Sequence, residues 1–273
     1  MIGFNELGRK GNLGNQMFQF AALLGIARCN GYDFSIPPQD ASRIHGYDLM
    51  KYFEMSSVGI ENVGYVPYRT HLTSIRHWPN SNDHVFSEKF VANVPDNRNL
   101  NGFFQSENYF SDVKAEILEN FAFRREHKAE LISLEEFDFA SAFAAIHIRR
   151  GDYLKRPDVH RVLGVEYYQQ AIDLLPENLP IAVFSNDLDW ARSQSIFVSN
   201  RNVSFITTPH YGLDMLGMSM ARYIVIANST FSWWAAYLSG AEKIIAPSKW
   251  YGPKLARRPL IGLYPSSWHQ IEV

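Results

Sequence analysis

The segment AFAAIHIRRGD (142–152) joins a short, almost continuously apolar run to two arginines and an aspartate. Such a run fits a strand of a parallel sheet that is buried on both faces, because helices cover both sides of that kind of sheet. The run ends at Arg149, so the charged residues 149–152 follow the carboxyl end of the strand. The segment therefore predicts a buried parallel strand that leads into a polar loop.

The residues that follow this segment alternate between strand-like and helix-like patterns. Further strands are predicted at 180–185, 203–207, 222–227 and 243–247, and helices at 164–175, 213–221 and 228–240. Pro176 stops the first of these helices, and Gly240 is expected to close the last one. Strands and helices that alternate at this spacing favour a doubly wound α/β domain.

The first half of the chain lacks this regular alternation of strand-like and helix-like patterns. A glycine-rich segment, GRKGNLGNQ (8–16), precedes a helix that is predicted over 16–29 and stops at Asn30-Gly31. The helical period places Met17, Phe20, Ala21 and Leu24 on one apolar face. Residues 35–100 carry many Pro, Asn, Ser and His residues, and we expect loops with short helices and strands there.

A second helix is predicted over 112–123, with Ser111 as its N-cap. The domain boundary is expected just before the first strong strand. This divides the chain into an N-terminal domain, 1–139, and a C-terminal domain, 140–273.

The composition excludes several classes of protein. The chain has 273 residues, of which 46% are hydrophobic and 20% are charged, so a disordered or collagen-like chain is excluded. The net charge is −2, and a general nucleic-acid binder is not expected because there is no basic excess to neutralise phosphates. Cys29 is the only cysteine, which rules out an intrachain disulfide or a cysteine-based zinc site.

The sequence contains no apolar stretch long enough for a transmembrane helix and no recognisable signal peptide. We therefore expect a soluble, cytoplasmic protein, at most peripheral to a membrane.

Ligands of parallel α/β sheets bind beyond the carboxyl ends of the strands. Arg149–Asp152, Asn186-Asp187 and Asn228–Ser232 each follow a predicted strand, and the last of these opens a helix. Arginine binds phosphate through two parallel hydrogen bonds, and helix N-termini offer free N–H groups to anions. Together these residues predict a diphosphate site. The structural alternative is that Arg149 pairs with Asp152 and that Ser229 only caps its helix.

Several motifs then point to one family. HIRRGD (147–152) resembles the H-x-R-R-x-D motif of GDP-fucose-dependent fucosyltransferases of the α-1,2, α-1,6 and protein O-fucosyl types. GNLGNQMFQFA (11–21), NGFFQSENYF (101–110), FSNDLDWAR (184–192) and ANSTFSWWAAYL (227–238) resemble motifs of the α-1,2-fucosyltransferases, glycosyltransferase family 11. These motifs occur in the family's order and span most of the chain.

The resemblance implies a GT-B fold, with two Rossmann-like domains that face each other across a cleft. It also implies an inverting transfer of L-fucose from GDP-L-fucose to a hydroxyl, commonly the 2-OH of a galactose. No metal and no cofactor are implied. The partners would be the GDP-sugar donor and a galactose-containing glycan, with the N-terminal half serving the acceptor.

By similarity, Arg149 is expected to contact the leaving diphosphate, with Arg150 as a supporting residue. Strand alternation would point the two arginines in opposite directions. The residues after 227 would donate to the diphosphate, and Asp187 or Asp189 would accept from guanine or ribose. The substrate-binding set implied is Gly11, Gly14, Asn15, Gln16, His147, Arg150, Asn186, Asp187, Asp189, Asn228, Ser229, Thr230, Phe231 and Ser232.

Inversion by single displacement requires a base for the acceptor hydroxyl. Asp152, His160 and Glu107 are the candidates, and the sequence does not separate them.

Three other interpretations remain open. Asp187 and Asp189 form a D-x-D pair, which could hold a divalent metal bound to a nucleotide. The chain could use another GDP-sugar or another acceptor. A binding module without catalysis is the third alternative, and the presence of Arg149 argues against it.

Overall fold

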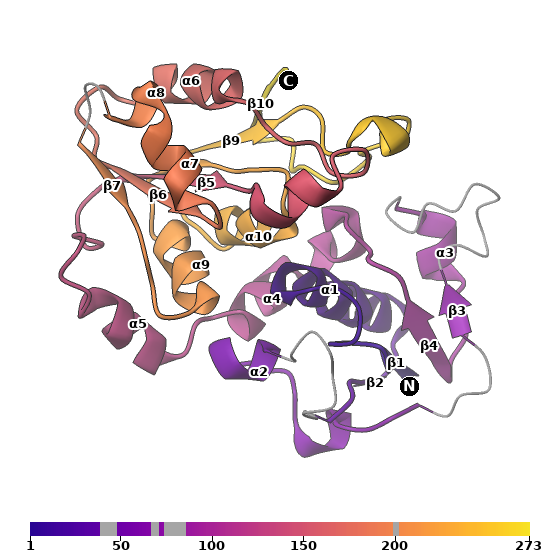
Figure 1. Cartoon of the computed structure of the whole chain (residues 1–273). Helices are drawn as coiled ribbons and strands as arrows, with labels where there is room; N and C mark the ends of the chain where they lie inside the picture. The colour runs from indigo at the N-terminus through magenta and orange to yellow at the C-terminus, as the bar shows by residue number, and fades with distance from the viewer. Residues whose placement is uncertain (39–47, 67–70, 74–85, 199–201) are drawn as a thin grey trace. The chain divides into compact units, whose positions relative to one another are not determined.

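The computed structural model describes residues 1–38, 48–66, 71–73, 86–198 and 202–273, which form two compact units (Figure 1). The first unit contains Met1–Arg124 and Pro259–Pro265, and the second contains Arg125–Arg258 and Ser266–Val273. Within the predicted loop region 35–100, the stretches 39–47, 67–70 and 74–85 lie outside the described residues.

The second unit is built on a six-stranded sheet in which every pairing is parallel. Its strands are β5 (Ala144–Ile148), β6 (Ile181–Ser185), β7 (Val203–Phe205), β8 (Tyr223–Val225), β9 (Lys243–Pro247) and β10 (His269–Ile271). Their spatial order is β10-β9-β8-β5-β6-β7. The chain starts at β5, runs outward through β6 and β7, and returns to β8 on the other side of β5. This order confirms the predicted doubly wound domain.

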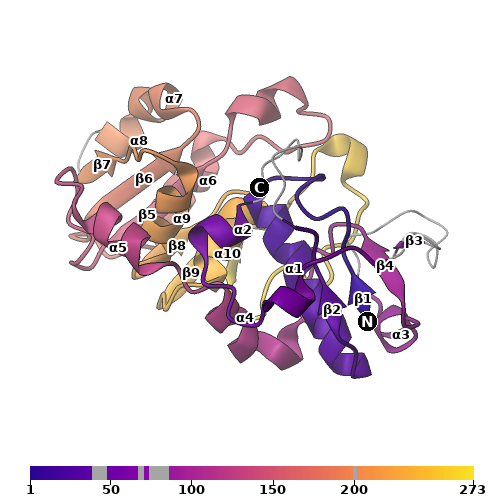
Figure 2. The same cartoon turned by 90° about the horizontal axis from the view of Figure 1, so that it is seen from below.

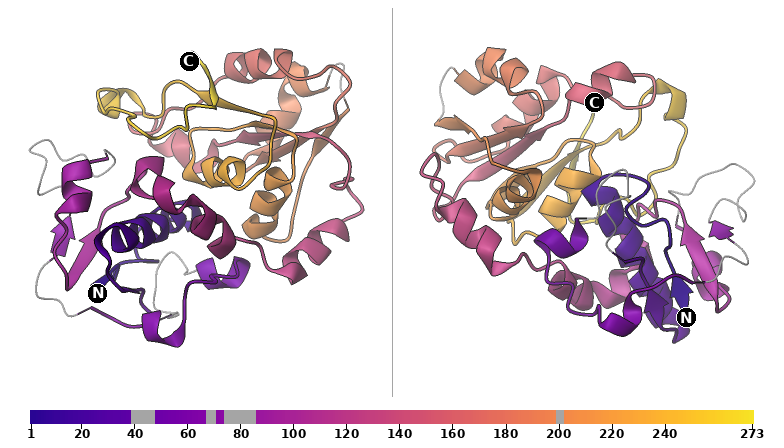
Figure 3. Two further views of the ribbon diagram at one scale, coloured as in Figure 1. Left: turned by 180° about the vertical axis from the view of Figure 1, so that it is seen from behind. Right: turned by 60° about the horizontal axis from the view of Figure 1, so that its bottom comes forward.

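Helices cover both faces of this sheet. Figure 1 shows α6 (Val165–Asp173), α7 (Leu188–Ser193) and α8 (Ser195–Val198) on one face, and α9 (Tyr211–Ser219) and α10 (Thr230–Tyr237) on the other. The reverse view in Figure 3 shows the same two layers. Alternate strand residues such as Ile146, Ile148 and Val183 pack with Tyr168 of α6 in one buried cluster. The residues between them, including His147 and Phe184, therefore belong to the opposite face.

The first unit carries a four-stranded parallel sheet with the order β2-β1-β4-β3. Its strands are β1 (Ile2–Gly3), β2 (Phe34–Ser35), β3 (His71–Thr73) and β4 (Arg98–Asn101). The long helix α1 (Leu13–Asn30) lies beside β1 and β2 (Figure 2). Shorter segments complete this unit: α2 (Leu49–Tyr52), η1 (Ile60–Asn62), α3 (Glu88–Ala92), η3 (Glu107–Tyr109), η4 (Ser111–Val113) and α4 (Lys114–Asn120).

Helix α1 confirms the helix predicted over 16–29, but it is buried on nearly every side rather than on one face. From Leu13 to Ala27, only Asn15 is not fully buried. The helix ends at Asn30, and its C-cap Gly31 has a φ of 66°, which lies in the left-handed region that glycine adopts without strain. A helix that is apolar around its whole circumference belongs to the centre of a domain, and α1 is the core of the first unit.

Two predicted helix ends are wrong. Ser111 does not cap the second helix, because it lies inside the 3-10 turn η4, and α4 starts only at Lys114, with Val113 at its N-cap position. Gly240 does not close α10, which ends at Tyr237 with Leu238 in a right-handed conformation. The predicted strands at 142–148, 180–185, 203–207, 222–227 and 243–247 are confirmed as β5 to β9.

The N-terminal part of the first compact unit ends at Arg124, and helix α5 (Arg125–Ile132) packs against α9 of the second unit. The segment Pro259–Pro265 returns to the first unit, where the carbonyl of Gly262 accepts a hydrogen bond from the N–H of Glu107 at 2.8 Å. No described helix is long and apolar enough to cross a membrane.

The packing of α1 leads to a prediction about Gly25. A Cβ at Gly25 would lie 2.1 Å from the backbone oxygen of Tyr109, so either α1 or the 109–110 backbone must shift. We expect Gly25→Ala to destabilise the chain by about 1–3 kcal/mol, the usual cost of overpacking. Gly240→Ala is the matched control, because nothing lies within 4 Å of its added Cβ. Thermal unfolding of both variants checks this, and an unchanged midpoint for Gly25→Ala would contradict it.

Candidate functional site

The order of the strands singles out one place on the second unit's sheet. The chain leaves β5 toward β6 and leaves β8 toward β9, so the loops after β5 and β8 diverge at adjacent strands. Such a switch point opens a crevice at the carboxyl ends of the strands, where ligands of doubly wound sheets bind. The residues after β5 begin with Arg149, and those after β8 lead into α10. The geometry therefore brings together two of the predicted phosphate-binding segments.

Arg149 is held in place by a carboxylate of its own loop. Its Nη2 lies 2.9 Å from Oδ1 and 3.0 Å from Oδ2 of Asp152. The side chain of Arg149 is 23% exposed, while that of Asp152 is 55% exposed. The buried Nε of Arg149 has no hydrogen-bond partner among the described residues. The guanidinium is therefore oriented, yet part of its donor capacity is unused.

Arg150 points to a different set of partners, as strand alternation predicts. Its Nε donates to Oδ2 of Asp187 at 3.2 Å, and its guanidinium lies 4.1 Å from the ring centroid of Trp190. The other carboxylate oxygen of Asp187 accepts from the N–H of Trp190 and caps α7. Arg150 thus fastens the loop after β5 to α7, which is a supporting arrangement.

Asn186 connects the loops after β5 and β6. Its Oδ1 accepts from the N–H of Arg150 at 2.9 Å, and its Nδ2 donates to Oδ1 of Asp152 at 3.3 Å. A Cβ at Gly151 would lie 2.4 Å from that Nδ2, so only glycine allows this close approach. The amide therefore positions Asp152, which in turn positions Arg149.

Tyr153, which sequence reasoning missed, joins the loop after β5 to the start of α10. It lies in the 3-10 turn η5 (Gly151–Lys155), and its hydroxyl donates to the backbone oxygen of Asn228 at 2.9 Å. Its ring stacks on His160 at 4.4 Å, and the guanidinium of Arg149 lies 5.5 Å from its centroid. Burial raises the pKa of Tyr153 to about 12, so the phenol stays protonated. The sequence could have indicated Tyr153 as a residue of the site, because it directly follows the RRGD segment (149–152).

His160 is half-buried beneath this tyrosine. Burial lowers its pKa most strongly, and the charge of Asp152 works in the opposite direction. The imidazole is therefore biased toward its neutral form, which is the form able to accept a proton.

The loop after β8 is fixed by Asn228. Its Nδ2 donates to the carbonyls of Arg161 at 2.9 Å and Trp250 at 2.7 Å, while its buried Oδ1 has no partner among the described residues. Gly252 lets the backbone of Pro157 and Asp158 approach its own backbone closely, since a Cβ at Gly252 would lie 2.6 Å from the carbonyl oxygen of Pro157.

The hydroxyls at the start of α10 are engaged in capping and helix contacts. Ser229 caps the helix by accepting from the N–H of Phe231 at 3.4 Å. Ser232 is buried and donates to backbone carbonyls, so its hydroxyl does not face a ligand. Thr230 is the partly exposed hydroxyl residue of this turn. Both parts of the structural alternative are therefore observed, because Arg149 pairs with Asp152 and Ser229 caps α10.

His147 is buried in β5 on the face that carries α9 and α10. Its ring centroid lies 5.7 Å from that of Phe231, and its Nδ1 has no hydrogen-bond partner among the described residues. Burial, with a smaller contribution from the charge of Arg149, lowers the pKa of His147 to about 3. His147 is therefore neutral over the physiological pH range.

In the first unit, the glycine-rich segment forms a loop held by side-chain amides. Gln16 donates to the carbonyl of Gly11 at 3.3 Å, and Gln105 donates to Oδ1 of Asn15 at 2.7 Å. Gly11 has a φ of 80°, and an added Cβ would clash with Asn15 at 2.5 Å. Gly14 is buried in the first turn of α1. Gln105 was missed, although it lies in the quoted motif at 101–110.

The remaining predicted residues do not form one group. Glu107 belongs to the first unit, whereas Asp152 and His160 belong to the second. Asp189 is fully exposed and lies 3.7 Å from Arg192 on the same helix. Asp187 and Asp189 do not belong to any group of three possible metal ligands within the described ranges. The group found there is His127, Glu130 and His210.

Comparison with known proteins identifies the relatives of this chain. The sequence model of glycosyl transferase family 11 matches residues 1–271. The alpha-1,2-colitosyltransferase of Escherichia coli is 28% identical over 270 residues, which cover 88% of this chain and 90% of that protein. Galactoside 2-alpha-L-fucosyltransferase SEC1 of Bos taurus is 29% identical over 259 residues, which cover 89% of this chain and 66% of that protein.

Solved structures share the fold at low identity. The fucosyltransferase NodZ from Bradyrhizobium has a TM-score of 0.54 at 16% identity, over 87% of this chain and 93% of that chain. A mutant of Arabidopsis thaliana FUT1 in complex with GDP has a TM-score of 0.54 at 14% identity, over 98% of this chain and 75% of that chain. The expected GT-B type fold with Rossmann-like units is thereby confirmed.

The buried imidazole of His147 predicts a specific pH dependence of stability. The unfolded chain takes up a proton near pH 6.5, whereas the folded chain resists protonation down to about pH 3. The unfolded state therefore binds more protons between these values, and stability falls as the pH is lowered through this window, by on the order of 1 kcal/mol per pH unit. We expect His147→Gln to show a shallower loss of stability between pH 6.5 and pH 4.

Guanidinium chloride unfolding at several pH values measures this slope. His269→Gln is the control, because His269 is exposed. Equal slopes for His147→Gln and the unchanged chain would contradict the prediction.

Proposed function

The chain belongs to glycosyl transferase family 11, and from this we propose that it transfers L-fucose from GDP-L-fucose to the 2-OH of a terminal galactoside, with inversion and without a metal. The observation that carries the proposal is the placement of Arg149 at the switch point between β5 and β8, beside the start of α10. That placement matches the needs of a diphosphate leaving group.

The names of the relatives support the proposed linkage more strongly than the proposed donor sugar. The bovine relative is named a galactoside 2-alpha-L-fucosyltransferase, and a NodZ structure of the same fold was soaked with GDP-fucose. The E. coli relative is named a colitosyltransferase and shares the alpha-1,2 linkage in its name. The linkage is thus common to relatives whose transferred sugars differ.

In the proposed reaction, the acceptor oxygen attacks C1 of fucose from the face opposite the diphosphate. The C1–O bond breaks, the diphosphate oxygen keeps the electron pair, and the acceptor proton passes to a base. Negative charge grows on the β-phosphate during this step. Arg149 stabilises that charge, because its guanidinium stays protonated at any working pH and is already oriented by Asp152.

The base is one of Asp152, His160 and Glu107. Asp152 already accepts hydrogen bonds from Arg149 and Asn186, which suits a positioning role. His160 combines a lowered pKa with partial exposure, so it has the proton-accepting form available at neutral pH. Glu107 is a candidate because it lies in the first unit, where the acceptor is expected to bind.

The colitosyltransferase relative favours a second candidate, transfer of colitose from a GDP-linked donor. The diphosphate site would be the same, and the difference would lie in a few contacts to the sugar. Parallel assays with the two GDP-sugars and one galactoside acceptor separate the candidates, because the preferred donor has the higher kcat/KM.

The direct test of the donor site is the loss of GDP binding in Arg149→Ala. Removing a charge-assisted hydrogen bond is expected to weaken GDP binding by about 10-fold or more. The loss of a preorganised donor lowers kcat by about 10²–10³-fold. Isothermal titration with GDP, GDP-L-fucose and UDP in a chelating buffer measures binding, and fucose transfer to a β-galactoside measures kcat.

Arg156→Ala is the matched control, since this exposed arginine follows the same turn and lies 3.6 Å from Asp158. Its GDP binding should remain unchanged. GDP binding that needs added divalent metal, or that survives in Arg149→Ala, would overturn the proposed site.

The close packing at Gly151 gives an independent prediction. In Gly151→Ala, the Asn186 amide must move away, and Asp152 loses its support. Misplacement of catalytic groups by about 1 Å costs up to about 10²-fold, so kcat/KM should fall about 10- to 100-fold. The thermal midpoint should change little, because the atom that yields is the end of a side chain. Steady-state kinetics alongside thermal unfolding checks this, and unimpaired kinetics would contradict it.

A further inference from the structure

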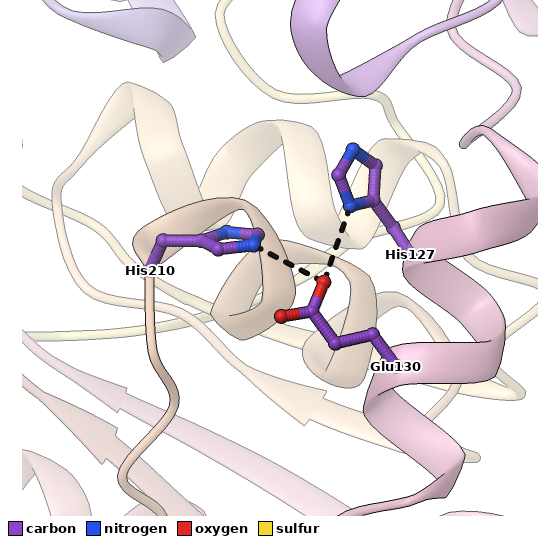
Figure 4. Close-up of side chains that lie close together, drawn as sticks. All are labelled: His127, Glu130 and His210. Atoms are coloured by element: carbon purple, nitrogen blue, oxygen red, sulfur yellow. Dashed lines mark hydrogen bonds and ion pairs between the residues drawn. The ribbon is translucent and has the colours of Figure 1, made fainter.

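Three side chains that the proposed reaction does not use converge in the second unit. His127 and Glu130 come from α5, and His210 immediately precedes α9. Figure 4 shows both imidazole rings directed at the same carboxylate oxygen of Glu130. One ligand atom from each residue lies within 4.8 Å of the other two.

Two distances in this cluster match the separation of ligand atoms around a metal ion. Nδ1 of His127 lies 3.5 Å and Nε2 of His210 lies 3.4 Å from Oε2 of Glu130. A charge-assisted hydrogen bond would be shorter, about 2.7–2.9 Å. Zinc binds imidazole nitrogen and carboxylate oxygen at about 2.0–2.2 Å, so tetrahedral geometry separates two ligand atoms by about 3.4 Å. Both nitrogen distances to Oε2 of Glu130 are close to that edge of the tetrahedron.

The residue types and their positions also fit. Residues three apart on a helix share a face, so His127 and Glu130 present their side chains together. Two imidazoles and one carboxylate form a ligand set typical of zinc, with a fourth position for water. The side chains of His127, Glu130 and His210 are 12%, 40% and 23% exposed, which leaves the carboxylate accessible to an ion from solvent.

We propose that His127, Glu130 and His210 bind one Zn²⁺ ion that fastens α5 to the turn before α9. Helix α5 needs such a fastening, because Leu131 is its one fully buried residue. An eight-residue helix is not stable by itself. The turn before α9 is already ordered, since the hydroxyl of Thr208 donates to the carbonyl of His210 at 2.9 Å.

The zinc proposal does not rest on the proposed function. None of the three ligands lies in the loops after β5, β6 or β8 that form the candidate donor site. Zinc bound here supports the fold of the second unit, so its removal should lower stability first. GDP titrations performed well below the unfolding temperature then report on the donor site alone.

The experiment is a metal titration of the full chain, purified without a polyhistidine tag. Zn²⁺ binding is measured by competition with a chromophoric chelator, and Co²⁺ replaces Zn²⁺ so that its visible absorption reports a tetrahedral site. We expect one Zn²⁺ per chain and a rise of several degrees in the thermal midpoint, because ligand that binds only the folded state stabilises it. Glu130→Gln and His210→Gln should each weaken Zn²⁺ binding by more than about 100-fold, beyond what loss of a supporting group costs.

Glu126→Gln and His269→Gln are the matched controls, since both residues are exposed and the first lies on α5 itself. Both should bind Zn²⁺ as the unchanged chain does. X-ray absorption of the zinc-loaded unchanged chain should detect two imidazole ligands, and it needs no variant to fold. The proposal is overturned by less than stoichiometric Zn²⁺ on the unchanged chain, by unchanged binding in Glu130→Gln and His210→Gln, or by an absorption spectrum without imidazole.

Discussion

The parallel pairing of β5 with β6 on one side and β8 on the other is the constraint on which the second unit depends. Because β5 is central, both of its faces must be covered, and its sequence is accordingly apolar from Ala144 to Ile148 except for one neutral histidine. The same pairing aligns the carboxyl ends of β5 and β8 while their chains leave in opposite directions. The polar loops that follow these two strands therefore start at the same edge of the sheet, which is where ligands of doubly wound sheets bind.

The polar side chains at this edge form a connected network rather than separate contacts. Asn186 holds Asp152, Asp152 holds Arg149, and Arg150 reaches away to Asp187 and Trp190. Two adjacent arginines are thereby kept apart: Arg149 pairs with Asp152 at the end of the strand, where we propose that it binds a diphosphate, and Arg150 joins the loop to α7. Orientation by fixed partners means that little reorganisation is required when charge develops nearby, which is the condition for electrostatic catalysis.

Sequence patterns predicted the strands of the second unit well because parallel strands buried on both faces are continuous apolar runs. They predicted the helix α1 in the first unit but placed its burial on one face, whereas α1 is buried on nearly every side. The polar residues were predicted as a set after each strand, but their connections were not. Tyr153 and Gln105 act through contacts with residues far away in the sequence, and spacing along one chain does not reveal such contacts. The predicted N-cap at Ser111 was wrong because Ser111 lies inside the 3-10 turn η4, which precedes α4.

The packing of helix α5 could not be predicted from its local sequence. This helix is short, mostly exposed and polar, and it contains one fully buried residue, so neither period nor propensity explains why it packs against α9. His127 and Glu130 alone do not indicate a metal site. The third ligand, His210, lies 80 residues after Glu130 in the sequence and is brought beside it only by the fold. The proposed metal ion would hold α5 against the turn before α9, which one buried side chain does only weakly. Bonds from a metal to its ligands join two segments without the large buried area that a hydrophobic contact needs. The proposed zinc ligands and the arginine network at the strand ends come from different loops, so neither proposed site uses a residue of the other.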